Sequence, residues 1–123
     1  MKEQIAIPNR SKEMVKLAYQ ALSDKKAIDI RIIDISAIST IADYFIIANG
    51  SNSNQIGALV DNVEESLYKA GFRGHRKEGY RNDSWILLDY NDLIIHIFDD
   101  KNRSFYNLER IWSDGKAVDI QSV

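Results

Sequence analysis

Cysteine is absent from the 123 residues, proline occurs once, and no long apolar run is present. Without cysteine the chain has neither a disulfide framework nor thiolate chemistry, which fits a reducing cytosol. A bilayer crossing needs about 20 consecutive apolar residues, and the opening MKEQIAIPNR lacks the apolar region of a signal peptide. We therefore expect a soluble, cytoplasmic protein.

A large excess of one charge sign is also missing, because 16 basic and 18 acidic residues give a net charge of −2. This balance argues against a protein that binds nucleic acid over its whole surface. The hydrophobic fraction of 45% is ordinary for a globular domain. We predict one domain over residues 1–115 and a short C-terminal tail over residues 116–123.

Two stretches carry apolar residues at spacings of three and four, which is typical of amphipathic helices. The first runs from residue 8 to about 25, and the second covers residues 56–70, where Gly71 would end the helix. Phe105, Leu108 and Trp112 predict a last helix by the same spacing.

Short runs rich in β-branched residues predict strands. They lie at residues 28–35, 43–49, 85–89 and 93–98, and residues 73–80 are an ambiguous edge strand. Helices and strands in this order predict an α/β (α+β) fold, with a mixed sheet of about five strands covered by helices.

The segment IIANGSNSNQI, residues 46–56, joins a predicted strand to a predicted helix through glycine and serine. Backbone N–H groups at such a junction can hold a phosphate. However, neither G-x-x-x-x-G-K-[ST] nor G-x-G-x-x-G is present. Ser51, Asn52 or Ser53 would each serve as a helix N-cap. We favour the cap.

A nucleotide site nevertheless stays open as the alternative, because Gly-Ser after a strand also occurs in nucleotidyltransferase-like folds. Their magnesium ions need Asp-x-Asp/Glu on one strand, where residues i and i+2 share a face. The nearest carboxylates, Asp89 and Asp92, are three residues apart across a predicted turn. The alternative site would use Gly50, Ser51 and Asp89.

The segment SWILLDYNDLIIHIFD, residues 84–99, predicts a β-hairpin around Tyr90-Asn91-Asp92. With a two-residue loop, period-two alternation gives the hairpin two different faces. One face is nearly all aliphatic and should meet the core: Ile86, Leu88, Tyr90, Leu93, Ile95 and Ile97. The other face mixes aromatic, acidic and imidazole groups: Trp85, Leu87, Asp89, Ile94, His96 and Phe98.

Two interpretations of the mixed face are open from spacing alone. Large aromatics with a few polar groups are typical of a protein-binding surface. Alternatively, Trp85 and Phe98 pack under the C-terminal helix while Asp89 and His96 satisfy each other. A metal site or cofactor is not expected, because the chain has two histidines, His75 and His96, and no cysteine. A G-x-S-x-G nucleophile motif is absent too.

The run RGHRKEGYR, residues 73–81, is locally basic. We favour a solvated edge whose charges discourage association between strands. The functional alternative is a peripheral contact with ribosomal RNA phosphates. That contact would use Arg73, Arg76, Lys77 and Arg81.

Several of these motifs occur in a characteristic order. They are Asp34 with Ser36 and Ser39, ADYFIIANGSN, Gln55, Glu78-Gly79, WILLDYNDLIIHIF, and Arg103 before FYNLERIW. In this combination the chain resembles the ribosomal silencing factor RsfS family, also called Iojap-like. One departure is Asn91, where the family usually has glycine. Asparagine tolerates the same left-handed backbone, so the hairpin should survive.

The resemblance implies a nucleotidyltransferase-like fold without catalytic carboxylates, and a protein that is not an enzyme. It implies binding to the large ribosomal subunit through universal ribosomal protein fourteen of that subunit, at the face that meets the small subunit. Occupying this face would block subunit joining and repress translation. For some members the resemblance also implies a role in large-subunit assembly.

With this resemblance the exposed, partner-binding interpretation of the mixed face is favoured. The apolar anchors are expected to be Trp85, Leu87, Ile94 and Phe98. Asp89 and Asp92 would meet basic groups of the ribosomal protein, and His96 would hydrogen-bond there. Such an exposed face could also pair two copies into a homodimer when the partner is absent.

Overall fold

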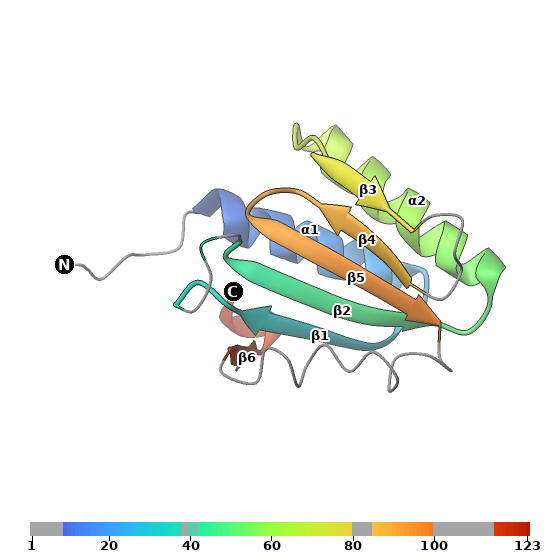
Figure 1. Ribbon diagram of the computed structural model, residues 1–123, viewed down its shortest axis with the longest axis horizontal. Coiled ribbons are helices and arrows are strands. Elements are labelled where there is room, and N and C mark those ends of the chain that lie inside the picture. Colours follow the sequence, from blue (N-terminus) through green and yellow to red (C-terminus); the bar gives the residue numbers. More distant parts are fainter. Residues whose placement is uncertain (1–8, 38–39, 41, 80–84, 100–114) are drawn as a thin grey trace.

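The computed structural model describes residues 9–37, 40, 42–79, 85–99 and 115–123. Two helices, α1 (Asn9–Asp24) and α2 (Ser53–Lys69), cover one face of a six-stranded sheet (Figure 1). The strands are β1 (Ile28–Asp34), β2 (Tyr44–Gly50), β3 (Arg76–Glu78), β4 (Trp85–Asp89), β5 (Leu93–Asp99) and β6 (Lys116–Val118), followed by the 3-10 turn η1 (Ile120–Ser122). The predicted α+β class is confirmed, with one strand more than the five expected.

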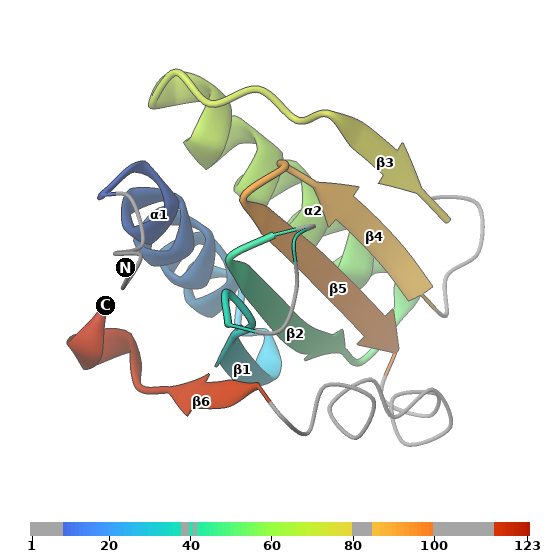
Figure 2. The same ribbon diagram turned by 60° about the vertical axis from the view of Figure 1, so that its left-hand side comes forward.

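The strands are ordered β3-β4-β5-β2-β1-β6. The central pair β2–β5 is parallel and every other pair is antiparallel, so the sheet is mixed as predicted. Figure 2 shows β3 at one edge of the sheet, beside α2, and β6 at the other edge. The ambiguous segment 73–80 thus contains a short edge strand.

The C-terminal segment contributes to the sheet instead of forming the tail that we predicted over residues 116–123. Ile32 of β1 is paired with Val118 of β6, and Asp34 with Lys116. Residues 116–118 form a strand because they pair with β1. A strand of three residues is too short to be recognised from the sequence. The helix predicted around Phe105, Leu108 and Trp112 lies outside the described residues. The 1–115 boundary stays a prediction. Within the described part, no helix is long and apolar enough to cross a membrane.

Helix α2 ends where glycine was predicted to end it. Gly71 has φ +91°, the left-handed conformation that glycine adopts without strain. The N–H of Gly71 donates to the carbonyl of Tyr68 at 3.0 Å, and that of Phe72 to Leu67 at 2.9 Å. These two bonds form a Schellman motif, which satisfies carbonyls at the helix end.

The core has two parts, one on each face of the sheet. Under the helices, α1 and α2 contribute fully buried side chains that include Met14, Leu22, Leu59 and Leu67. The opposite face carries a second buried cluster. It consists of Ile33, Ile35, Ala42, Phe45, Ile47, Ile94 and Phe98. The mixed face of the hairpin therefore belongs to a hydrophobic cluster of its own.

The junction between β2 and α2 is a helix cap. The side chain of Asn52 accepts a hydrogen bond from the Gln55 N–H at 2.8 Å, while Gln55 Oε1 accepts from the Ser51 N–H at 2.6 Å. Gln55 Nε2 also donates to the carbonyl of Lys26 at 2.9 Å, which ties α2 to the loop after α1. A Cβ on Gly50 would lie 2.6 Å from Ile56 Cγ1, so glycine allows the helix to approach the strand.

We expect Gln55→Ala to lower the free energy of unfolding by about 1–2 kcal/mol, because it removes hydrogen bonds at both the cap and the loop. Urea denaturation followed by circular dichroism measures the change. The matched control is Gln20→Ala, since Gln20 is an exposed glutamine whose side chain donates to Asp24 one turn away. Equal effects of the two substitutions would contradict the bridging role of Gln55.

Candidate protein-docking site

The hairpin has the register that a two-residue loop requires. Trp85 is paired with Phe98, and Asp89 with Ile94. Asn91 has φ +68°, and its N–H donates to Asp89 Oδ1 at 2.8 Å. The turn that asparagine was expected to preserve is therefore present. The aliphatic face also lies where alternation predicted, in the core beneath the helices: Ile86, Leu88, Tyr90, Leu93, Ile95 and Ile97.

The exposure predicted for the mixed face is wrong for its three residues on β5. Ile94 is 7% exposed, His96 is 4% exposed and Phe98 is fully buried. Side chains of the two neighbouring strands pack against them, because β5 lies between β4 and β2. Phe45 and Ile47 of β2 join the same cluster as Ile94 and Phe98. These β5 residues therefore form a floor beneath the surface.

The residues of β4 are only partly buried. Trp85, Leu87 and Asp89 alternate along this strand toward the mixed face, and each keeps an intermediate exposure. Trp85 and Leu87 pack against the buried cluster of that face. The accessible part of the mixed face is thus a row along β4.

Aromatic rings support this row from below. The Trp85 ring is stacked on that of Phe98, with centroids 5.6 Å apart and an interplanar angle of 17°. The His96 ring lies 5.9 Å from Trp85 and meets Phe45 edge-on at 4.7 Å. Because three strands contribute to this cluster, the ring of Trp85 is held in one orientation.

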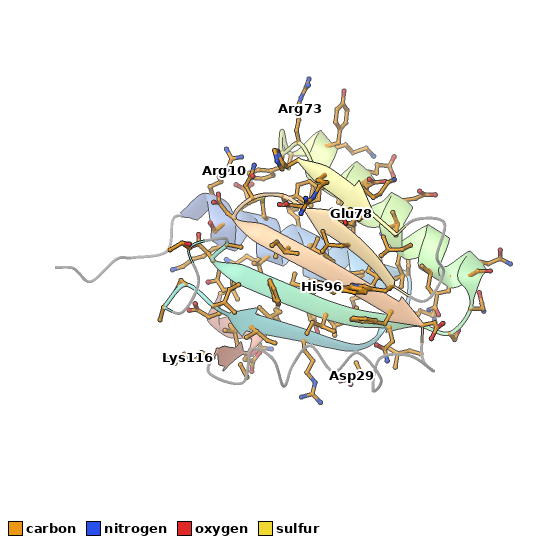
Figure 3. All side chains as sticks on the ribbon, viewed as in Figure 1. Arg10, Asp29, Arg73, Glu78, His96 and Lys116 are labelled. Atoms are coloured by element: carbon orange, nitrogen blue, oxygen red, sulfur yellow. The ribbon has the colours of Figure 1, made fainter. Side chains whose placement is uncertain are left out.

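His96 is the buried polar side chain beside this cluster and lies in the middle of the sheet (Figure 3). Its Nδ1 accepts a hydrogen bond from Trp85 Nε1 at 3.1 Å. Burial lowers the pKa of His96 from 6.5 to about 4, so the ring is neutral at pH 7. An indole N–H can only donate, so the proton of the neutral imidazole sits on Nε2. That Nε2 is buried and has no hydrogen-bond partner among the described residues.

The two aspartates near the turn have different roles. Asp89 does not pair with His96, as one interpretation held, because its carboxylate accepts from Asn91 and lies 3.8 Å from Arg76. Its side chain is 13% exposed, whereas that of Asp92 is 41% exposed. Asp92 lies 3.6 Å from Arg10, a contact between α1 and the hairpin that strand alternation could not reveal.

Two cations of the basic run are paired with neighbouring acids. Lys77 pairs with Glu64 of α2 at 3.2 Å, and Arg76 pairs with Glu78 at 2.9 Å. Arg73 makes no ion pair with any described residue, and Arg81 lies outside the described residues. Local ion pairs of this kind favour the solvated edge over an RNA contact.

The alternative nucleotide site is not assembled. Gly50 is paired with Asp99 of β5, whereas Asp89 is paired with Ile94 of the same strand. Gly50 and Asp89 are therefore offset by five residue steps along β5, roughly 16 Å at about 3.3 Å per residue. The Ser51 N–H and hydroxyl both donate to Gln55 within the cap. The described residues also contain no cluster of three or more metal-ligating side chains.

Comparison with known proteins gives a consistent result. A family model described as "Ribosomal silencing factor during starvation" matches residues 8–123. The chain is 35% identical to the ribosomal silencing factor RsfS of Bacillus subtilis over 109 residues, covering 89% of this chain and 92% of that protein. It is 34% identical to the protein of the same name from Halalkalibacterium halodurans, covering 92% and 97% of the two chains. The chloroplastic protein Iojap of Zea mays is 29% identical over 82% of this chain and 44% of its own length.

Solved structures agree with the sequence matches. The crystal structure of a Chromobacterium violaceum protein superimposes with a TM-score of 0.80 and 32% identity, covering 83% of this chain and 85% of that one. A Bacillus halodurans structure gives a TM-score of 0.78 with 31% identity, covering 88% and 98%. The fold and the sequence therefore point to the same relatives.

Proposed function

The chain belongs to the ribosomal silencing factor family, and from this we propose that it binds the large ribosomal subunit and blocks joining of the small subunit. The contact is with universal ribosomal protein fourteen of the large subunit, and the effect is steric occlusion. The role is regulatory rather than catalytic, in the cytoplasm where subunits meet.

The β4 row supports this proposal and is its main structural argument. Trp85 is a large indole that is partly exposed above a floor of buried rings, with Leu87 beside it, and tryptophan is enriched in binding hot spots. Asp92 lies at the turn beyond this row with a half-exposed carboxylate, suited to a basic group of the partner. The buried Ile94, His96 and Phe98 position the row and do not themselves present a surface.

The direct experiment combines sedimentation with subunit joining. Purified large subunits are incubated with the full chain, pelleted through sucrose, and then mixed with small subunits. We expect the chain to co-sediment with the large subunit and to reduce the yield of joined ribosomes. Co-sedimentation without an effect on joining would contradict occlusion, and absence of co-sedimentation would contradict the proposal as a whole.

The variant Leu87→Glu tests which surface docks. A charge placed among apolar interface groups without a partner costs several kcal/mol, so we expect affinity for the large subunit to fall at least about tenfold. The matched control is Ile28→Glu, which changes another accessible apolar side chain, 41% exposed, on β1. Equal binding by Leu87→Glu, Ile28→Glu and the unchanged chain would show that a different surface is used.

A further inference from the structure

A cleft of about 700 Å³ lies between the C-terminal half of α2 and the edge strand β3. It is away from the mixed face, because its floor consists of aliphatic-face residues of the hairpin, Leu88 and Tyr90, together with Phe72. One wall is Tyr68, which is 70% exposed although it is a large aromatic. The cleft thus combines a buried apolar floor with an accessible aromatic wall.

The free charge in this cleft is positive. Lys77 pairs with Glu64, and Glu65 pairs with Lys69, so these groups already neutralise one another. Arg73 lines the cleft without an ion pair to any described residue, and Figure 3 shows it pointing away from the body of the protein. A ligand bound in the cleft would therefore meet this guanidinium group at the rim, where its side chain extends outward.

A hydrogen-bond donor also lies at the floor. The hydroxyl of Tyr90 makes no hydrogen bond with the described residues, although the residue is 5% exposed. Burial, and then the nearby Glu64, raise the pKa of Tyr90 to about 12. The hydroxyl therefore keeps its proton and can donate to a carbonyl or carboxylate oxygen.

The strand beside the cleft has no described strand on its outer side. β3 is paired with β4 alone, and its three residues are all exposed. Gly79 follows β3 in the chain and has φ +80°. An added Cβ at this position would lie 2.2 Å from the Trp85 carbonyl oxygen. Only glycine fits there, and among the described strands β3 is an edge strand, whose unpaired side is the usual place for a further strand to add.

We propose that this cleft is a second docking site, which binds an extended and mainly apolar peptide segment of a partner protein, carrying one acidic side chain, by strand addition to β3. The main chain of the segment pairs with the outer side of β3, as extended peptides do on exposed sheet edges. An apolar side chain of the segment lies against Tyr68 and Phe72, and its carboxylate meets Arg73.

A peptide fits better than RNA for two reasons. A phosphate backbone would place successive negative charges beside Glu64 and Glu65, which line the same cleft. Arg76 and Lys77 are already engaged by acidic side chains of this protein, so few cations are left to replace phosphate counterions. A single carboxylate on an otherwise apolar strand matches one free arginine.

The experiment selects short random peptides displayed on phage against the full chain, with the Arg73→Glu variant screened in parallel. We expect the enriched sequences to contain aspartate or glutamate beside apolar residues. Their affinity, measured by fluorescence anisotropy, should fall about tenfold for Arg73→Glu and for Tyr68→Ala. The matched control is Lys16→Glu, the same change of charge at an exposed position of α1, which should bind as the unchanged chain does.

Hydrogen exchange gives the second readout. Bound peptide should slow exchange of those backbone amides of β3 that point away from β4, because strand pairing protects them. Selection of no peptide that prefers the unchanged chain over Arg73→Glu would overturn the proposal, as would protection confined to other segments. If RNA oligonucleotides bind with a steep salt dependence and peptides do not, the ligand of the cleft is a nucleic acid and the proposal is wrong. The ribosome experiment does not enter this test, so the two proposals can fail separately.

Discussion

Lowering the pH from 7 to 4 should remove about 3 kcal/mol of unfolding free energy through His96 alone. The pKa of this histidine is about 4 in the folded protein, because burial disfavours the charged ring, against 6.5 in the unfolded chain. Between these two values the unfolded state binds more protons than the folded state. Stability is therefore complete above pH 6.5 and decreases as the pH falls toward 4.

Urea denaturation at a series of pH values measures this loss. Carboxylates also titrate in acid, so the comparison is with His96→Asn, which keeps an acceptor near Nδ1 for Trp85 but does not titrate. We expect the difference in unfolding free energy between the two proteins to change by about 3 kcal/mol from pH 7 to pH 4.

The histidine control is His75→Asn, which replaces the exposed second histidine and leaves His96 in place. Parallel profiles for the unchanged chain and His96→Asn would show that His96 is hydrated in solution. The buried site described above would then be wrong.

Trp85→Ala should weaken binding to the large subunit by about thirtyfold, or about 2 kcal/mol, the usual loss at an aromatic hot spot. The substitution removes the ring that lies over Phe98 and that forms the accessible part of the β4 row. Quantitative sedimentation with purified large subunits measures the affinity, and circular dichroism establishes that the variant is folded.

Trp85→Phe separates docking from stability. Phenylalanine keeps an aromatic ring in the row, but it cannot donate to His96 Nδ1. We expect ribosome affinity close to that of the unchanged chain, together with a loss of about 1–2 kcal/mol in unfolding free energy. If Trp85→Phe and Trp85→Ala lose the same ribosome affinity, the indole N–H contacts the partner, and its bond to His96 is broken on docking.

Local patterns in the sequence were enough to predict much of the fold. Asn91 indicated a tight turn, and the alternation on either side of it placed Ile86, Leu88 and Ile95 in the core. Gly71 ended α2 as expected, and Asn52 forms the helix cap that was favoured over a nucleotide site. Each of these features depends on residues within a few positions of one another.

The candidate site was predicted only in part. Trp85, Leu87 and Asp89 were assigned to the correct face, but the exposure of Ile94, His96 and Phe98 was wrong. The strand β2 is buried along its whole length, so it carries no alternation that could have placed Phe45 and Ile47 beside them. The three-residue strands β3 and β6 were likewise too short to show a clear period.

The sequence by itself determined the hairpin register, the helix ends and which side chains share a face, because these follow from backbone geometry over a few residues. Only the tertiary structure decided which shared face is accessible. That outcome depends on the parallel pairing of β2 with β5, strands more than forty residues apart in the chain. Burial of a side chain is set by its neighbours in space, and the position of β5 between two strands is not encoded in β5 alone.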